Sequence, residues 1–242
     1  MSHPVSSTLA RASRRVSQLL SAPADSSRRH LRRAAAVAAM VFSPAALALT
    51  PFVWEQVTAP IESGAACGNG SPYKFYVNTN PLSDKWAVVY EGGGACWAQG
   101  TCAGDGGLLG ATLPNGIPDN YMSSLDGSTS GGAGFLGLST PFTSRIPVLG
   151  TATVTQSWNM IYFPYCTGDV HTGNKAAVYN NQDPANPMTY QHKGAVNVEG
   201  VAKWMAANLR QPDHLLLTGF SAGGVGSAAN YPMFRNTVKP KK

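Results

Sequence analysis

A serine between glycines is the first candidate for chemistry in this chain of 242 residues. It is Ser221, in the sequence Gly219-Phe220-Ser221-Ala222-Gly223-Gly224. The apolar run 215–218 comes directly before this motif, and the small, helix-compatible residues 225–234 come directly after it. This order predicts a strand, a tight turn and a helix, with a serine nucleophile on the turn.

A nucleophile on such a turn needs small neighbours, because its backbone is strained and side chains two residues away would collide with it. Gly219 and Gly223 provide that space. The turn would hold the hydroxyl of Ser221 at the start of a helix, where the helix dipole and the free amide of Ala222 favour a developing negative oxygen. The alternative is a helix-opening Gly-Ser turn without chemistry.

A second glycine motif, Glu91-Gly92-Gly93-Gly94-Ala95-Cys96-Trp97, follows the apolar run that ends at Tyr90. Serine esterases place a glycine-rich oxyanion loop in this position. Because glycine lets backbone amides approach an oxyanion closely, we expect Gly93 and Gly94 to form an oxyanion hole together with Ala222. A phosphate-binding loop is the competing interpretation, but the motif lacks the Lys-Ser/Thr signature of a nucleotide site.

A third motif, Tyr-Cys-Thr-Gly-Asp-Val-His-Thr-Gly at residues 165–173, places Asp169 and His171 two residues apart. In an extended segment such side chains lie about 7 Å apart, too far for the direct bond that orients a catalytic histidine. We therefore expect His171 to have a structural or pocket-wall role rather than that of general base. His192 and His214 have no supporting motif and are expected in surface or loop positions.

The general base is the part of the mechanism that the sequence does not supply. In α/β-hydrolases an Asp or Glu and then a His follow the nucleophile, but the 21 residues after Ser221 contain none of the three. A serine without a base stays protonated, so the chain as given is expected to be a poor esterase or none. We expect that the sequence stops before the acid and the base, which would leave the strand at Leu215 as an exposed apolar edge.

The spacing of apolar residues predicts the elements that position these motifs. Strands are expected at 73–77, 86–90, 160–163 and 215–218, the second and the last of them buried, and an amphipathic helix at 195–209. Residues 104–139, rich in Gly and Ser, are expected to form a long insertion over the sheet. Together these elements predict one α/β domain with a mostly parallel central sheet.

Charge and composition exclude several classes of protein. The chain is 43% hydrophobic and 12% charged, and no stretch reaches the roughly 18 apolar residues of a membrane-spanning helix. Its net charge of +6 comes from residues 1–33, which contain seven arginines and one aspartate, so the remainder is neutral. The net charge of the chain is therefore no argument for a nucleic-acid partner.

The first 48 residues resemble an export signal and basic leader. A basic region is followed by the apolar run 34–47 and by Ala46-Leu47-Ala48, so cleavage is expected after Ala48, with no stable membrane insertion afterwards. Residues 27–32 loosely resemble a twin-arginine signal, which leaves the general secretory and the twin-arginine routes open. The alternatives are an N-terminal amphipathic helix or a misplaced start codon. Residues 49–242 would form the incomplete α/β domain, in the periplasm or outside the cell.

All four cysteines follow the leader, where an oxidising compartment would let them pair. Of the three possible pairings, one joins Cys96 with Cys102, six residues apart across a Gly-containing loop, and leaves Cys67 with Cys166. A zinc site is the weaker alternative, because no Cys-x-x-Cys occurs and the histidines are scattered. No metal and no cofactor are expected.

Taken together, these motifs resemble the pectin acetylesterase family, which includes the Notum-type carboxylesterases. The glycine block at 91–97, the 165–173 block and the serine block at 219–224 occur in the family's order, as does Cys-Gly-Asn-Gly-Ser-Pro-Tyr at 67–73. The resemblance runs from about Cys67 to Asn236 and implies an α/β-hydrolase-like fold with part of its C-terminal side missing. It also implies a secreted serine hydrolase of acyl esters, with Ser221 as nucleophile, and the same two cysteine pairings.

The expected reaction is acyl transfer to Ser221 and then hydrolysis, on an acylated carbohydrate or small ester. The expected acyl group is acetyl, and a polysaccharide such as pectin is a candidate alcohol. The alternatives are a noncatalytic secreted carbohydrate-binding or pseudoenzyme module on the same scaffold and a structural exported domain. The sequence predicts no oligomeric state.

Overall fold

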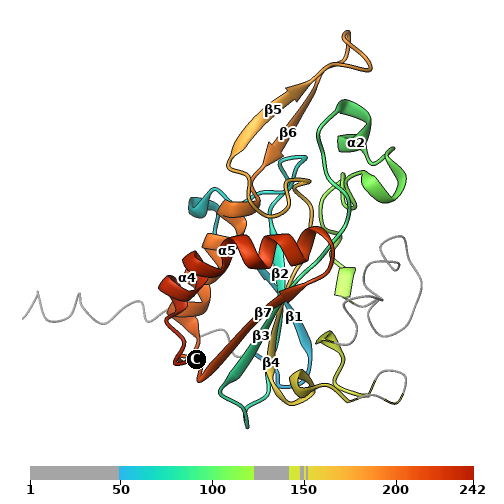
Figure 1. Ribbon diagram of the computed structural model, residues 1–242. Coiled ribbons are helices and arrows are strands. Elements are labelled where there is room, and N and C mark those ends of the chain that lie inside the picture. Colours follow the sequence, from blue (N-terminus) through green and yellow to red (C-terminus); the bar gives the residue numbers. More distant parts are fainter. Residues whose placement is uncertain (1–48, 123–141, 148–149, 151) are drawn as a thin grey trace, which may run out of the picture. The chain divides into compact units, whose positions relative to one another are not determined.

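A five-stranded sheet positions the candidate site in the computed structural model, which describes residues 49–122, 142–147, 150 and 152–242. The strand order is β1-β2-β4-β3-β7 (Figure 1). The strands are β1 (Trp54–Thr58), β2 (Lys74–Asn78), β3 (Lys85–Tyr90), β4 (Asn159–Phe163) and β7 (His214–Gly219). The described residues belong to one compact unit, Ala46–Lys242. The predicted leader and residues 123–139 of the predicted insertion lie outside the described residues.

The sheet is mixed, and its parallel part carries the candidate site. Strand β3 pairs in parallel with both β4 and β7, whereas β2 is antiparallel to β4 and to β1. Four of the five strands therefore run in one direction and β2 runs in the other. The predicted α/β fold is confirmed, with β2 as the antiparallel strand.

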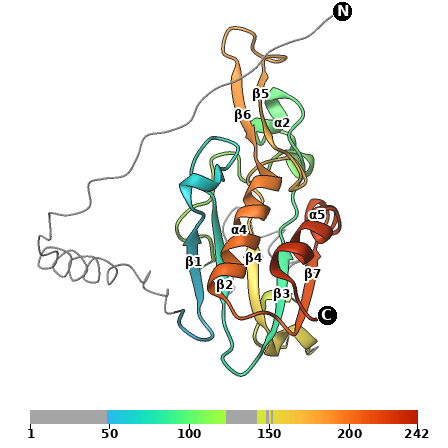
Figure 2. The ribbon, with the colours of Figure 1, turned by 90° about the vertical axis from the view of Figure 1, so that its left-hand side faces the viewer.

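Two helices lie on one face of the sheet, in front of it in Figure 2. They are α4 (Gly194–Asn208) and α5 (Ala222–Val238), which pack against each other and confirm the helices predicted over 195–209 and after Ser221. Shorter elements complete the described part: η1 (Ile61–Ser63), α2 (Gln99–Ala103), η2 (Gly107–Leu109), η4 (Val154–Ser157), and the hairpin of β5 (Lys175–Tyr179) with β6 (Met188–His192).

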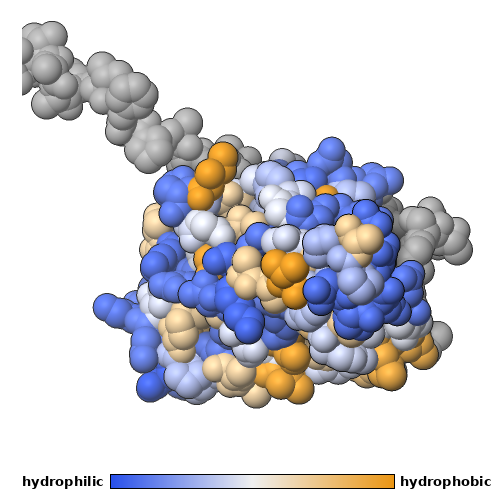
Figure 3. Space-filling model, turned by 90° about the horizontal axis from the view of Figure 1, so that it is seen from above, coloured by the Kyte–Doolittle hydropathy of each residue, from blue (hydrophilic) through white to orange (hydrophobic). Residues whose placement is uncertain are grey.

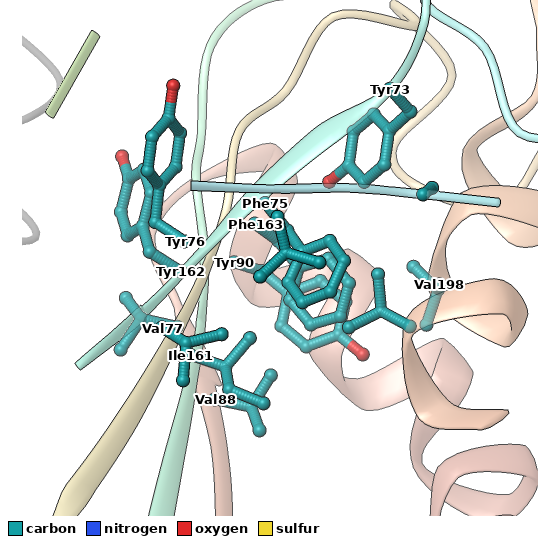
Figure 4. Packing of buried hydrophobic residues seen from close by; sticks show 14 of the residues in the cluster. Tyr73, Phe75, Tyr76, Val77, Val88, Tyr90, Ile161, Tyr162, Phe163 and Val198 are labelled. Atoms are coloured by element: carbon teal, nitrogen blue, oxygen red, sulfur yellow. The ribbon is translucent and has the colours of Figure 1, made fainter. Parts of the chain in front are cut away.

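The core between the sheet and the helices is rich in aromatic side chains (Figure 4). The rings of Tyr90 and Phe163, at the ends of the paired strands β3 and β4, stack with centroids 4.7 Å apart. Phe75 of β2 and Val198 of α4 are fully buried in the same cluster. The continuous apolar run of β3 is buried as predicted, because strands cover both of its edges and the helices pack above it.

Strand β7 differs from the prediction of a buried strand. All six of its residues are half-buried, because it is the edge strand of the described sheet and pairs with β3 alone. Helix α5 covers one of its faces. The backbone amide of Leu215 donates to the carbonyl of Lys242 at 3.0 Å, so the end of the described chain covers the start of this edge.

Candidate active site

Two loops leave the sheet side by side where β3 and β7 end. Tyr90 and Gly219, the last residues of the two strands, are partners in the parallel register. The glycine loop at 91–97 and the serine turn at 219–224 therefore start at the same level. They are in close contact, because a Cβ placed on Gly92 would lie 3.2 Å from Cβ of Ser221 and would collide with the carbonyl oxygen of Phe220.

Ser221 occupies a strained backbone conformation directly before α5. Its φ is 53° and its ψ is −121°, a region that residues with a side chain rarely adopt. Its side chain is exposed, and its hydroxyl makes no hydrogen bond within the described residues. A strained, exposed serine on a strand-to-helix turn is the arrangement that presents a hydroxyl for nucleophilic attack.

The glycines on either side of Ser221 are required by contacts with β3. A Cβ on Gly219 would lie 2.5 Å from the carbonyl carbon of Gly223 and 2.7 Å from the carbonyl oxygen of Tyr90. A Cβ on Gly223 would lie 2.6 Å from the carbonyl oxygen of Glu91 and nearer still to that of Tyr90. The serine turn therefore packs against the start of the glycine loop, which explains both glycines of the motif.

The glycine loop offers backbone donors that the fold leaves unused. The amides of Gly92, Gly93 and Gly94 make no hydrogen bond to any residue that the structure describes, and neither does the amide of Ala222 in the first turn of α5. Gly93 has a φ of 142°, and a Cβ there would overlap the side chain of Thr112. The structure thus brings the predicted donors into neighbouring turns, and their role as an oxyanion hole remains a prediction.

Asp169 and His171 belong to the scaffold beneath this site. The carboxylate of Asp169 accepts four hydrogen bonds, from the hydroxyl of Thr167 (2.7 Å) and from the amides of His171 (3.1 Å), Gly173 (3.1 Å) and Gly194 (2.7 Å). It therefore fixes its own loop and the start of α4. A carboxylate with these four donors does not orient the imidazole of His171.

His171 is buried between the glycine loop and α5. Its Nε2 lies 2.9 Å from the carbonyl oxygen of Glu91, which can only accept, so this nitrogen carries the proton. The side chain of Asn230 on α5 donates to the carbonyl of His171 at 2.9 Å. Burial lowers the pKa of His171, against the opposing effects of the Glu91 carbonyl and Asp169. These contacts agree with the structural role predicted for His171.

Glu91 is the residue of this region that the sequence analysis did not single out. Its side chain is fully buried, with the hydroxyl of Tyr121 and the amide of Tyr165 (2.8 Å) donating to its two carboxyl oxygens. Burial raises its pKa to about 7, although these hydrogen bonds lower it. The available signal was an acidic residue at the end of an apolar strand, directly before three glycines.

Both expected disulfides are present. The long disulfide joins Cys67 with Cys166, 99 residues apart, and the short disulfide joins Cys96, in the glycine loop, with Cys102, six residues further on. His192 packs beside the short one and is buried rather than on the surface. Its ring binds the hydroxyl of Tyr179 (2.8 Å) and the carbonyl of Thr167 (3.1 Å), and these partners explain why the prediction for it was wrong.

The third histidine of the described part, His214, is the half-buried first residue of β7 rather than a loop residue. No group of three or more His, Cys, Asp or Glu side chains within the described ranges could hold a metal ion. Among the helices of the described part, none is long and apolar enough to cross a membrane.

The relatives found by comparison with known proteins include carboxylesterases and pectin acetylesterases. A model of the Pectinacetylesterase family matches residues 150–242. The palmitoleoyl-protein carboxylesterase NOTUM of Homo sapiens is 28% identical over 172 residues, which cover 70% of this chain and 30% of that protein. Pectin acetylesterase 4 of Arabidopsis thaliana is 23% identical over 185 residues, which cover 72% of this chain and 38% of that protein. The resemblance to the pectin acetylesterase family is confirmed.

The solved structure of the Wnt deacylase Notum from Drosophila superposes with a TM-score of 0.49 at 22% identity, covering 75% of this chain and 46% of that one. The chain spans 30% of the length of human NOTUM and 38% of that of the plant pectin acetylesterase. The family match includes β4, β7, Ser221 and α5, whereas the glycine loop lies before it.

Proposed function

We propose that this chain carries the nucleophile and the oxyanion loop of a serine carboxylesterase. The observation that carries the proposal is the strained, exposed Ser221 packed against a glycine loop with three unused amides. A strained φ and ψ at a polar, exposed residue costs about 1–3 kcal/mol, and such strain is concentrated at functional sites. The names of the relatives, which are carboxylesterases and pectin acetylesterases, support the same class of reaction.

In the proposed reaction, the oxygen of Ser221 attacks the carbonyl carbon of an ester. The carbonyl oxygen takes up the negative charge and is stabilised by the amides of Gly93, Gly94 and Ala222. The intermediate collapses, the alcohol leaves with a proton, and the acyl group stays on Ser221. Water then hydrolyses this acyl-serine, which releases the carboxylic acid and restores the hydroxyl.

The proton of Ser221 needs an acceptor, and neither buried histidine of the described part is free to act as one. His171 is bound to the Glu91 carbonyl, and both ring nitrogens of His192 have partners. In the proposed enzyme an Asp and a His supply this function. The same observation favours the second candidate function, a noncatalytic module that keeps the scaffold without turnover.

For the substrate, we propose an acetyl ester of a carbohydrate, such as acetylated pectin. The face seen from above, the end that carries α2 and the β5–β6 hairpin, is mostly hydrophilic, with hydrophobic groups in small separate clusters (Figure 3). Such a surface favours a polar polysaccharide over a lipid surface. We also propose that the protein is exported, because of its leader and its two disulfides.

A fluorophosphonate probe tests the nucleophile directly, since it phosphonylates an activated serine. The full chain, produced by export so that both disulfides form, would be labelled and digested to locate the modified residue. We expect the probe on Ser221 and no labelling of Ser221→Ala. The matched control is Ser157→Ala, which removes an exposed serine in η4, before the start of β4 and so at the opposite end of the parallel strands from Ser221.

Hydrolysis of p-nitrophenyl acetate and p-nitrophenyl octanoate by the same proteins tests the acyl group. We expect any turnover to favour acetate and to be lost in Ser221→Ala but not in Ser157→Ala. Folded protein in which Ser221 remains unlabelled would contradict the esterase proposal for this chain and support the noncatalytic module.

A further inference from the structure

The glycine loop has no means of holding its own shape. Gly92, Gly93 and Gly94 have no side chains, and their amides form no hydrogen bond within the described part of the chain. Preorganised donors must nevertheless stay in place while charge develops, because catalysis falls steeply when they move. Besides the packing of the glycines against Phe220, Thr112 and Leu109, the hydrogen bonds that position the loop must therefore come from its flanking residues.

On its C-terminal side the loop is held by the backbone. The amide of Ala95 donates to Leu109 at 2.8 Å, the amide of Cys96 donates to Gly168 at 2.7 Å, and the short disulfide follows. These contacts fix the position of the C-terminal end of the loop.

On the N-terminal side of the three glycines, the hydrogen bonds are made by one residue, Glu91. The amide of Glu91 donates to the carbonyl of Phe163 at 2.9 Å, and the carbonyl of Glu91 accepts from Nε2 of His171 at 2.9 Å. Its carboxyl oxygens accept from the hydroxyl of Tyr121 and from the amide of Tyr165 at 2.8 Å. Glu91 thus joins three separate segments to the loop, and the next residue, Gly92, already touches the serine turn.

We propose that Glu91 is the positioning residue of the oxyanion loop, because its carboxylate ties the loop to the end of β4 and to the 117–122 segment. The expected effect of Glu91 on the reaction rate rests on the proposed esterase function. Its expected effect on the position of the loop does not. Glu91 has no part in bond making or breaking. Its effect on the reaction would pass through the positions of the amides of Gly93 and Gly94.

The cost of burying this carboxyl supports a role beyond packing. This fully buried carboxyl loses more hydration than its hydrogen bonds to Tyr121, Tyr165 and Tyr162 replace, and burial raises the pKa of Glu91 to about 7. An uncharged side chain of similar size would avoid that cost. The ionised form offers acceptor oxygens to both Tyr121 and Tyr165, whereas protonation places a hydrogen on one of them.

The surroundings make Glu91 the group that changes charge near neutral pH. The titratable side chains around it are Tyr73, Tyr76, Tyr121, Tyr162, Tyr165 and His171. Burial raises the pKa of Tyr121 and of Tyr165 and lowers that of His171, so these three are neutral at pH 7. Two other carboxylates act on the same tyrosines. Asp169 acts on Tyr73 and Tyr165 and accepts hydrogen bonds from its own loop, and Asp119 acts on Tyr76 and is paired with Lys74.

The test compares Glu91→Gln, which keeps the shape and removes the charge, with Tyr121→Phe, which removes one donor. The control, Glu199→Gln, makes the same chemical change on the exposed side of α4. The rate of phosphonylation of bound probe (kinact) and the binding constant of the probe (KI) would be measured between pH 5.5 and 8.5. We expect about a tenfold lower kinact for Glu91→Gln at pH 8, an unchanged KI, and a smaller loss for Tyr121→Phe.

The wild-type kinact should also follow a titration near pH 7 that is absent from Glu91→Gln, which a merely structural residue would not produce. A kinact within twofold of wild type at every pH, in folded Glu91→Gln, would overturn the proposal. If wild-type Ser221 does not react at all, the esterase proposal fails and hydrogen exchange decides about Glu91. At pH 8 local opening of the loop should then make the amides of Tyr165 and Ala95 exchange at least tenfold faster in Glu91→Gln than in wild type, although the whole fold of the variant is no less stable. Equal exchange would refute the positioning role.

Discussion

The contact between the serine turn and the end of β3 predicts that Gly223→Ala destabilises the protein, although alanine is the better helix former. Gly223 lies in α5, where replacing Gly by Ala normally gains about 1 kcal/mol. Here the new methyl group would lie 2.6 Å from the carbonyl oxygen of Glu91 and nearer still to that of Tyr90. A carbon atom needs a separation of about 3.5 Å, so the backbone of one element must move by roughly an ångström.

That movement has a high free-energy cost, because neither obstacle is a flexible side chain. Tyr90 is fully buried, and the amide of Glu91 is bonded to Phe163 at 2.9 Å, so the end of β3 cannot yield without breaking the sheet ladder. Overpacking of this kind costs typically about 1–3 kcal/mol and more where backbone must shift. We therefore expect a net loss of at least about 2 kcal/mol in the free energy of unfolding.

The matched control is Gly200→Ala in the middle of α4. The nearest atom to its new methyl group would be Oγ of Ser63 at 3.4 Å, an ordinary contact, so we expect a gain of about 0.5–1 kcal/mol. Urea unfolding followed by circular dichroism measures both changes. The two substitutions are chemically identical and should have opposite signs; a Gly223→Ala protein as stable as Gly200→Ala would refute the packing of the serine turn described above.

Three further changes should have measurable effects. Ser221→Gly should abolish probe labelling and yet raise the free energy of unfolding by about 1 kcal/mol. Glycine relieves the strain at the φ of 53°, and this gain exceeds the entropy that a glycine loses on folding. Thermal denaturation measures the change, and a variant less stable than wild type would contradict the prediction. Burial raises the pKa of Glu91 to about 7, so the stability it contributes is full below the unfolded-state pKa and is lost as pH rises through 7. Relative to Glu91→Gln, wild type should therefore lose about 3 kcal/mol of its free energy of unfolding between pH 4 and 8. Urea unfolding at each pH measures this, and curves of free energy against pH that run parallel for the two proteins would rule it out. Replacing both cysteines of the long disulfide by serine should lower the free energy of unfolding by about 4–5 kcal/mol, and the same change in the short disulfide by about 2 kcal/mol. The reason is that a disulfide restricts the unfolded chain more when it closes a longer loop, and the sequence separations are 99 and 6. Equal losses in urea unfolding would contradict this.

The sequence predicted those parts of the fold that depend on neighbouring residues. The strand, turn and helix around Ser221 follow from a short apolar run, paired glycines and a helix-compatible segment, all within about twenty residues. Strand β3 was recognised from its continuous apolar run. The short disulfide closes a ring of a few residues, so its pairing is also a local matter.

The parts that the sequence did not predict depend on distant partners. Glu91 is bonded to residues 30, 74 and 80 positions away in the chain, and an acidic residue beside glycines does not specify them. His192 is buried because Tyr179 and Thr167 meet its two ring nitrogens, a pairing that exists once the β5–β6 hairpin has formed. That hairpin itself was missed, because β5 is exposed over most of its length and has no apolar stripe.

The three motifs that suggested chemistry therefore divide into two kinds of residue. Ser221 and the glycine amides leave their polar groups unpaired within the described part of the chain. Asp169, His171 and Glu91 instead have their side chains bonded to neighbouring segments. Unpaired groups are available to a substrate, whereas paired groups hold neighbouring segments in position. Changes at Ser221 should accordingly alter reactivity while the fold is kept, and changes at Asp169 or His171 should lower stability and reactivity together. This difference separates the nucleophile from its scaffold experimentally, whatever residue accepts the proton.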